Sequence, residues 1–207
     1  AVQTRQEHRL DAVCAAAQTT LATANGKALE DRARIDQRRC IRCLTCFRLC
    51  PYGAVRITEA ERVEVTADAC ERCGICAAEC PRTAIAIPGL GRDELFKSTP
   101  AAPNAGAQIV AFCCTRSAAQ AGRYARRLGL TTPSGLKMIE VPCAGTVSLG
   151  HLMAAFGSGA DGVMVISCHP DNCHSRCGND FARQRVDLLA SRFGQIGIDP
   201  GRIAVRT

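Results

Sequence analysis

Apolar and polar residues along positions 109–207 fall into blocks that predict strands and helices in turn. Apolar runs of the kind buried on both faces of a sheet occupy IVAFCC (109–114), LKMIEVPC (136–143), GVMVISC (162–168) and IAVRT (203–207). Helical periodicity ending at glycine occupies the segments between them: SAAQAGRYARRLGL (117–130), SLGHLMAAFGSG (148–159) and GNDFARQRVDLLASRFGQIG (178–197). This alternation predicts an α/β domain over 109–207, built on a doubly wound parallel sheet.

Shorter patterns mark the first half of the chain. YGAVRI (52–57) and RTAIAI (82–87) alternate as short strands do. ERVEVTAD (61–68) is typical of the return strand of a hairpin. We therefore expect a small α+β domain over residues 31–88.

The segments outside these two domains lack such patterns. Proline and glycine without sustained periodicity predict a linker over residues 89–108. Residues 1–30 are expected to form an N-terminal helix or linker, in which Cys14 would be a small packing residue. No apolar stretch reaches the roughly 18 residues of a membrane span, and the first residues differ from a signal peptide. We expect a cytoplasmic protein with reduced thiols and no direct membrane insertion.

Fifteen cysteines change the picture, because eight of them form two identical runs. The first run, CIRCLTCFRLCP (40–51), and the second run, CERCGICAAECP (70–81), align cysteine for cysteine. Both read CxxCxxCxxxCP, the pattern of bacterial two-cluster ferredoxins, in which the fourth cysteine of each run ligates the other cluster. The predicted ligands of two 4Fe-4S clusters are Cys40, Cys43, Cys46 and Cys80 for cluster 1, and Cys50, Cys70, Cys73 and Cys76 for cluster 2.

The spacing within each run has a physical reason. Thiolates two residues apart let a tight loop hold three corners of a cubane, and Pro51 and Pro81 end the turn that delivers the fourth ligand. Zinc is the alternative, but it favours paired CxxC units and closes at four ligands. Two identical runs of four cysteines therefore favour iron–sulfur clusters.

The charges around the two runs differ. The first run is accompanied by four basic residues: Arg38, Arg39, Arg42 and Arg48. The second run has both signs of charge: Glu71, Glu79, Arg72 and Arg82. Because a reduced cluster is more negative, we expect cluster 1 to have the higher potential. The alternative is an ordinary solvated basic face.

Five further cysteines follow the predicted strands of the second domain. Cys113 and Cys114 end the first strand, Cys143 the second and Cys168 the third, and Cys173 lies in the loop that follows. Because the carboxyl ends of parallel strands border the ligand crevice of such sheets, we expect a metal or cluster site there. Cys113 and Cys114 point to opposite faces of a regular strand, so only one of them is expected to be a ligand.

The identity of this third site follows from its ligand types. Four thiolates suit a 2Fe-2S cluster, and a chain with two cubanes favours a third redox centre. Zinc stays open, with four thiolates or with three and either His169 or His174. Haem attachment needs CxxCH, and the interval from Cys168 to Cys173 is too long for it. A thiol oxidoreductase, in which neighbouring cysteines exchange a disulfide without iron, also stays open.

The charge and the histidines limit other functions. A formal charge of +7 invites an anionic partner, yet three clusters of about 2− each would reduce it to about +1. With 4% aromatic residues, we expect no nucleic-acid partner. His8 and His151 do not complete a set of acid, base and nucleophile, and His151 is expected to be a polar residue at a helix start. We therefore expect no substrate chemistry in this chain.

The motifs IVAFCC, VPCAG, GADGVMVISCHPDNCH and GNDFARQRV resemble the delta-subunit family of methyl-viologen-reducing hydrogenase over residues 109–207. The resemblance implies an electron-transfer module with one 2Fe-2S cluster, which links an electron-donating enzyme to a heterodisulfide reductase. It implies that the cluster ligands are among Cys113, Cys114, Cys143, Cys168 and Cys173. One departure is Ser117, which stands where the family pattern CCxxC has its third cysteine. Cys177 would compensate, since it precedes a helix whose dipole favours a thiolate; the alternative is that the third cluster has been lost.

The first half has a second resemblance. RLDAVCAAAQTTLATANGK (9–27), followed by the two runs, is similar to the C-terminal tail of the A subunit of heterodisulfide reductase. Its fusion to a delta-type domain is similar to the B subunit of the quinone-interacting membrane-bound oxidoreductase and to class II benzoyl-CoA reductase complexes. The implied setting is anaerobic metabolism. The implied partners are a heterodisulfide-reductase-like flavoprotein, its iron–sulfur subunits, and a hydrogenase or other dehydrogenase. No GxGxxG fingerprint is present, so flavin is expected only in a partner or in a missing segment.

Overall fold

The computed structural model describes residues 31–97 and 108–207. The N-terminal helix expected over 1–30, with Cys14, lies outside the described residues. A small unit begins the described chain, and its elements are β1 (Arg34–Ile35), α2 (Thr45–Leu49), β2 (Val55–Ile57), β3 (Val63–Val65), η1 (Ala67–Ala69), α3 (Ile75–Ala78) and β4 (Ile85–Ala86). A connecting helix and a larger unit follow, and their elements are α4 (Arg92–Lys97), β5 (Ile109–Cys114), α5 (Ala118–Arg127), β6 (Leu136–Val141), η2 (Ala144–Thr146), α6 (Leu149–Gly157), β7 (Gly162–Ile166), α7 (Gly178–Gln195), η3 (Pro200–Arg202) and β8 (Ile203–Arg206).

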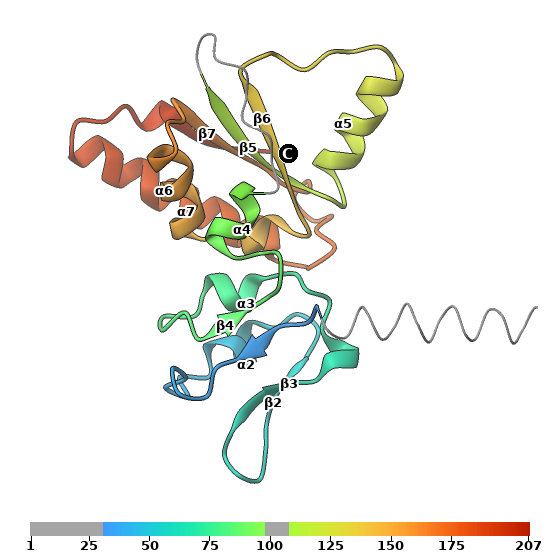
Figure 1. Ribbon diagram of the computed structural model, residues 1–207, viewed down its shortest axis with the longest axis vertical. Helices are drawn as coiled ribbons and strands as arrows, with labels where there is room; N and C mark the ends of the chain where they lie inside the picture. The colour runs from blue at the N-terminus through green and yellow to red at the C-terminus, as the bar shows by residue number, and fades with distance from the viewer. Residues whose placement is uncertain (1–30, 98–107) are drawn as a thin grey trace, which may run out of the picture.

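The small unit is built from two short antiparallel strand pairs around the cysteine loops. β2 and β3 form the predicted hairpin, with Val55 opposite Val65. β4 pairs with β1, a two-residue strand that the pattern did not predict because so short a segment carries no periodicity. In Figure 1 this unit lies beneath the larger one, and α3 lies on the side of the small unit that faces the larger unit.

The larger unit contains a four-stranded parallel sheet in the order β6-β5-β7-β8. The predicted parallel α/β domain is confirmed, and its strands lie in the predicted apolar runs. All three predicted helices are followed by glycine at positive φ, and these residues are Gly129, Gly159 and Gly197. Because the strands are parallel and in register, the cysteines that follow β5, β6 and β7 reach the same edge of the sheet.

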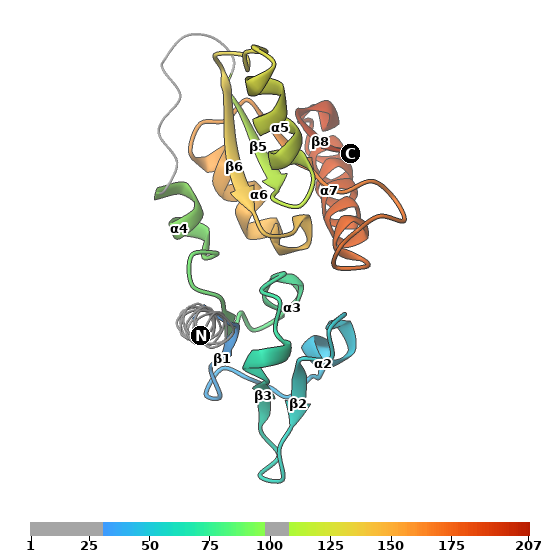
Figure 2. The ribbon, with the colours of Figure 1, turned by 90° about the vertical axis from the view of Figure 1, so that its right-hand side faces the viewer.

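Helices cover both faces of this sheet (Figure 2). On one face, α6 and α7 pack onto a core that includes the fully buried Phe112 and Val165. On the other face, α5 packs through Ala119 onto Ala111 and Cys113. Burial of these alternating side chains is the main stabilising term for the sheet.

The expected linker over 89–108 contains α4, which the pattern did not predict. Leu95 is buried in the core of the larger unit, and the ring of Phe96 meets the ring of Phe112 edge-on at 6.1 Å between centroids. Two anchoring side chains in one short turn leave too little periodicity to distinguish a helix from a loop. In residues 31–97 and 108–207, no helix combines the length and apolar character that crossing a membrane requires.

Candidate metal centres

A first cavity is lined by the thiols of Cys40, Cys43 and Cys46 from the first run and by Cys80 from the second. Its remaining walls are mainly apolar, with Ile35 among them, and it is partly open to solvent. The structure thus brings together the four residues predicted for cluster 1.

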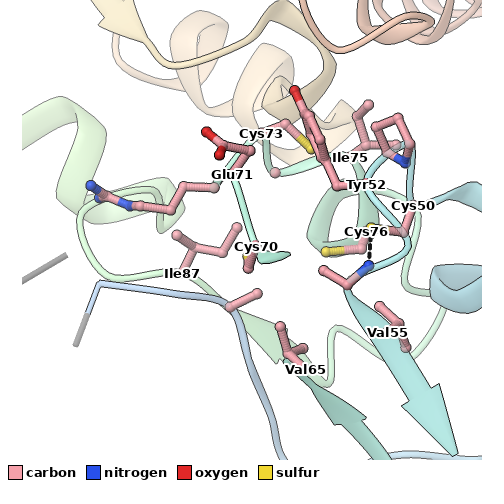
Figure 3. A pocket seen from close by; sticks show the side chains of 15 residues that line it. Cys50, Tyr52, Val55, Val65, Cys70, Glu71, Cys73, Ile75, Cys76 and Ile87 are labelled. Atoms are coloured by element: carbon pink, nitrogen blue, oxygen red, sulfur yellow. Dashed lines mark hydrogen bonds between the residues drawn. The ribbon is translucent and has the colours of Figure 1, made fainter. Parts of the chain in front are cut away.

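A second cavity is lined by the other four predicted thiols: Cys50, Cys70, Cys73 and Cys76. Figure 3 shows Cys50 reaching it from a separate segment, while Cys70 and Cys73 come from the loop that leads into α3 and Cys76 comes from α3 itself. Tyr52, Ile75 and Ile87 are among the other residues that line it. Each cavity therefore receives three thiols from one run and one from the other.

The two runs have the same backbone conformation. Arg42 and Leu44 in the first run have positive φ, as do Arg72 and Gly74 at the equivalent positions of the second. Alternation of this kind turns successive backbone N–H groups toward one concave side, which is a typical binding geometry for anionic iron–sulfur cores.

Backbone donors also reach the fourth thiol of each run. The Ala54 N–H donates to Cys50 Sγ at 3.3 Å, and the Ala84 N–H donates to Cys80 Sγ at 3.2 Å. Hydrogen bonds of this kind stabilise a thiolate and tune the potential of a bound cluster. Four thiols from two segments and a donor-lined loop together fit a 4Fe-4S cluster at each site.

A third group of thiols lies at the carboxyl edge of the parallel sheet. Cys114 Sγ and Cys168 Sγ are 3.6 Å apart, at the ends of the neighbouring strands β5 and β7. Cys143 follows β6, and Cys173 lies in the loop between β7 and α7. Gly178 makes room for this group, because an added Cβ would lie 2.2 Å from Cys143 Sγ and 3.5 Å from Cys173 Sγ. Four converging thiols around a required glycine fit a 2Fe-2S cluster.

Cys113 and Cys177 lie differently. Cys113 is buried on the opposite face of the sheet, under α5, so the structure does not bring it to the other four thiols. Cys177 precedes α7 and packs near Cys73 and Cys143. The hydroxyl of Ser117 donates to the backbone carbonyl of Ser167 at 3.3 Å.

Burial controls the ionisation of several of these thiols. It raises the pKa of Cys143 to about 12 and that of Cys168 and Cys73 to about 11. Hydrogen bonds from the Ser175 hydroxyl and the Gly145 N–H oppose this effect at Cys143. Such thiols hold their protons until a metal stabilises the thiolate, so cluster assembly is coupled to proton release.

The second cavity and the third group of thiols meet across the interface between the two units. Tyr52, in the wall of the cavity, donates from its hydroxyl to Ser175 Oγ at 3.0 Å, and Ser175 in turn bonds to the Cys143 thiol. Cys73, Ile75 and Cys143 share one small buried cluster. Sequence reasoning missed Tyr52 and Ser175, because no local pattern indicates that residues so far apart in the chain meet.

The buried Arg185 forms hydrogen bonds across the same interface. Arg185 of α7 donates through Nε and Nη2 to the Glu79 carboxylate of the small unit, with the Nε bond at 2.8 Å. Its Nη1 donates to the carbonyls of Gly145 and Val147 at 3.0 and 2.8 Å. One side chain thus ties the residue before Cys80 to the loop after Cys143.

His151 has the structural role expected of it. It lies in the first turn of α6, where its Nδ1 accepts the Ser148 N–H at 3.0 Å in a capping box. Its Nε2 reaches the Leu90 carbonyl at 3.2 Å.

Among the described residues, no three or more His, Cys, Asp or Glu side chains are already gathered as ligands of a single metal ion.

Comparison with known proteins places these features in a family. Residues 109–207 match the family of the methyl-viologen-reducing hydrogenase delta subunit, and residues 33–87 match the 4Fe-4S dicluster domain. The iron-sulfur D subunit of the F420-non-reducing hydrogenase of Archaeoglobus profundus is 37% identical over 95 residues, which cover 46% of this chain and 69% of that protein. The chain belongs to the delta-subunit family of methyl-viologen-reducing hydrogenase.

This delta-subunit family member is also similar to larger proteins. It is 32% identical over 174 residues to the A subunit of the ferredoxin:CoB-CoM heterodisulfide reductase of Methanosarcina mazei, a match that covers 83% of this chain. The A subunit of the ferredoxin/F420H2-dependent CoB-CoM heterodisulfide reductase of Methanosarcina acetivorans is 34% identical over the same length. The chain spans 22% of the length of each of these two relatives. These relationships support an iron–sulfur electron-transfer role for the delta-type chain.

Proposed function

We propose that this chain relays single electrons through three iron–sulfur clusters, between a flavoprotein of the heterodisulfide-reductase type and a hydrogenase or another dehydrogenase. When bound, the clusters would supply one-electron oxidation and reduction. The observation that carries the proposal is the convergence of twelve thiols, from separate segments, on two cavities and one sheet edge.

The ligands follow from this placement. Four thiols line each cavity in the small unit and would hold one 4Fe-4S cluster there. The third site would hold a 2Fe-2S cluster through Cys114, Cys143, Cys168 and Cys173. Cys114 and Cys168 follow the neighbouring strands β5 and β7; the chain leaves β5 for β6 on one side and leaves β7 for β8 on the other, which favours a ligand crevice between these two strands. Residues 31–88 and 109–207 are then the two domains, joined by a connection that carries α4.

The same contacts give the clusters an order. Cys46 of the first cavity and Cys70 of the second lie in one buried cluster, against which Cys76 also packs. Cys73 of the second cavity shares another buried cluster with Cys143 of the third site. Electrons would therefore pass between the first cavity and the third site by way of the second.

The residues at the interface keep this path intact. Ile75 is fully buried between Cys73 and Cys143, and Tyr52 packs against the same cluster. The Ser175 hydroxyl donates to the Cys143 sulfur, which favours its thiolate form. Arg185 holds the two domains in one arrangement, as a fixed path for electrons requires.

A thiol oxidoreductase is a second candidate, favoured by the 3.6 Å separation of the Cys114 and Cys168 sulfur atoms. These two thiols would then form and break a disulfide bond with no iron present. The two functions predict different cluster signals for variants that lack one of these cysteines.

The test is electron paramagnetic resonance of anaerobically purified, dithionite-reduced protein. For Cys168→Ala, we expect loss of the 2Fe-2S signal with the cubane signals retained. Cys113→Ala is the matched control, because Cys113 lies on the other face of the sheet, and it should leave all signals intact. A wild-type protein with no 2Fe-2S signal, whose Cys114 and Cys168 titrate as a reversible disulfide, would favour the second candidate.

A further inference from the structure

The internal repeat allows each part of the first run to be compared with its counterpart in the second. The two runs have positive φ at equivalent positions, and each continues into a short helix, α2 or α3. Corresponding residues therefore occupy corresponding places around their cavities. A difference in side chains at such places reflects a difference in what each run contacts.

The outer face of the second run is covered by the α/β domain. Gly74 lies so close to that domain that an added Cβ would be 2.0 Å from Thr146 Oγ1. Ile75 is fully buried, and an added Cβ at Gly145 would meet its side chain at 2.6 Å. The next outward residue, Ala77, is small. The second run thus uses this face as a protein interface.

The same face of the first run has no cover among the described residues, although its side chains are larger. Phe47, at the position of Ala77, is 48% exposed, and Ile41, at the position of Glu71, is 59% exposed. Cys43 is the one exposed cysteine in residues 31–97 and 108–207, whereas its counterpart Cys73 is buried. Exposed aromatic and aliphatic side chains around a thiol of the first cavity are unusual for a purely solvated face.

The charges around these residues have one predominant sign. Arg38, Arg39, Arg42 and Arg48 are all exposed. Arg42 has an ion pair with Glu61 at 3.1 Å, and Arg48 donates to the Cys43 carbonyl at 3.1 Å, which keeps its charge beside that thiol. An apolar centre with a basic rim is complementary to a partner with an apolar centre and an acidic rim.

We propose that the port surface, defined as Arg38, Ile41, Cys43, Phe47 and Arg48, docks an acidic electron-transfer protein at the first cavity. The inference rests on the proposed function and adds to it the place where electrons enter or leave the small domain. The partner's carboxylates would face Arg38 and Arg48, and its apolar centre would cover Phe47 and Ile41. One electron would pass between the partner and the cluster held by Cys43, with no bond formed or broken.

The test uses a bacterial flavodoxin in its hydroquinone form as the probe, because it is a small acidic flavoprotein that donates one electron at a time. Its flavin becomes the semiquinone as one cubane is reduced, and stopped-flow absorbance follows both. With Arg38→Glu and Arg48→Glu combined, we expect the second-order rate constant at low salt to fall at least tenfold and its salt dependence to flatten. Phe47→Ala should lower the rate constant severalfold.

Matched controls come from the far end of α7, where Arg192 and Ile196 are also exposed. Arg192→Glu and Ile196→Ala should leave the rate constant within twofold of wild type. The proposal is overturned if the port variants react as fast as the controls. It is also overturned if removal of residues 1–30 accelerates wild-type reduction, or if Phe47→Ala abolishes self-association of the chain, since either result gives the surface another occupant.

Failure of the proposed function would look different. Wild-type protein without iron or without cubane absorbance cannot be reduced at all, whichever surface is altered. Intact cubanes in all variants with unchanged rate constants would refute only the docking surface. Iron content and the visible spectrum of each variant are therefore measured before the kinetics.

Discussion

The buried Arg185 offers a direct test of the fixed arrangement of the two domains. Its side chain is 8% exposed, and it bonds to Glu79 across the interface as well as to the carbonyls of Gly145 and Val147. Arg185→Met keeps much of the apolar stem but removes every one of these donors. The substitution therefore separates the interface contacts from simple packing on α7.

The size of the effect follows from what is left behind. Breaking a buried ion pair by removing one partner costs about 3 to 5 kcal/mol. Glu79 is 29% exposed, so water can hydrate the carboxylate that remains, and we expect the lower end, about 3 kcal/mol. A change of about 3 kcal/mol raises the population of the locally opened interface on the order of 100-fold.

Hydrogen–deuterium exchange of the anaerobic protein measures this opening. In Arg185→Met, amides of η2 and α3 should exchange on the order of 100-fold faster, while those of β5 and β7 in the sheet should not change. Arg183→Met is the matched control, because Arg183 is an exposed arginine two residues away on the same helix. If η2 and α3 remain within about threefold of wild type, the arginine does not hold the domains together.

Three further predictions concern the third site and the α6 cap. Ser175→Ala removes the hydroxyl donor to Cys143, so the 2Fe-2S potential should fall by tens of millivolts in a redox titration, and an unchanged potential would contradict the hydrogen bond. Gly178→Ala places a Cβ 2.2 Å from Cys143 Sγ and should remove the 2Fe-2S signal, whereas Gly157→Ala, with open space around it, should not. Burial lowers the pKa of His151 in the folded protein, whereas in the unfolded chain this histidine has its usual pKa near 6.5. Between pH 7 and pH 5 the unfolded chain therefore binds more protons at His151 than the folded protein does. The free energy of unfolding should fall as the pH is lowered over this range. The thermal midpoint of His151→Gln should be less sensitive to pH over that range; equal sensitivity would assign the effect to other groups.

Much of this fold could be predicted because its signals are local. The strand over 109–114 is a continuous apolar run, and the glycines after the three helices have the positive φ that such ends require. The repeated CxxCxxCxxxCP pattern predicted which thiols line each cavity, including the fourth thiol that comes from the other run, because the ligation rule of this motif is known.

The features that sequence reasoning missed depend on distant contacts. Nothing near Leu95 indicates that it belongs to the core of the α/β domain, so α4 was expected to be linker. Alternation along β5 limited the ligands to one of Cys113 and Cys114, but only the positions of β7 and α5 distinguish them. The bond between Tyr52 and Ser175 likewise depends on how two separately folded units meet.

Iron, acid-labile sulfide and zinc analysis of anaerobically purified protein tests the central claim most directly. Two 4Fe-4S clusters and one 2Fe-2S cluster predict about ten iron atoms and about ten sulfides per chain, with no stoichiometric zinc. About eight iron atoms or fewer after complete reconstitution, or zinc bound in their place, would contradict the assignment of these thiols to a three-cluster electron relay.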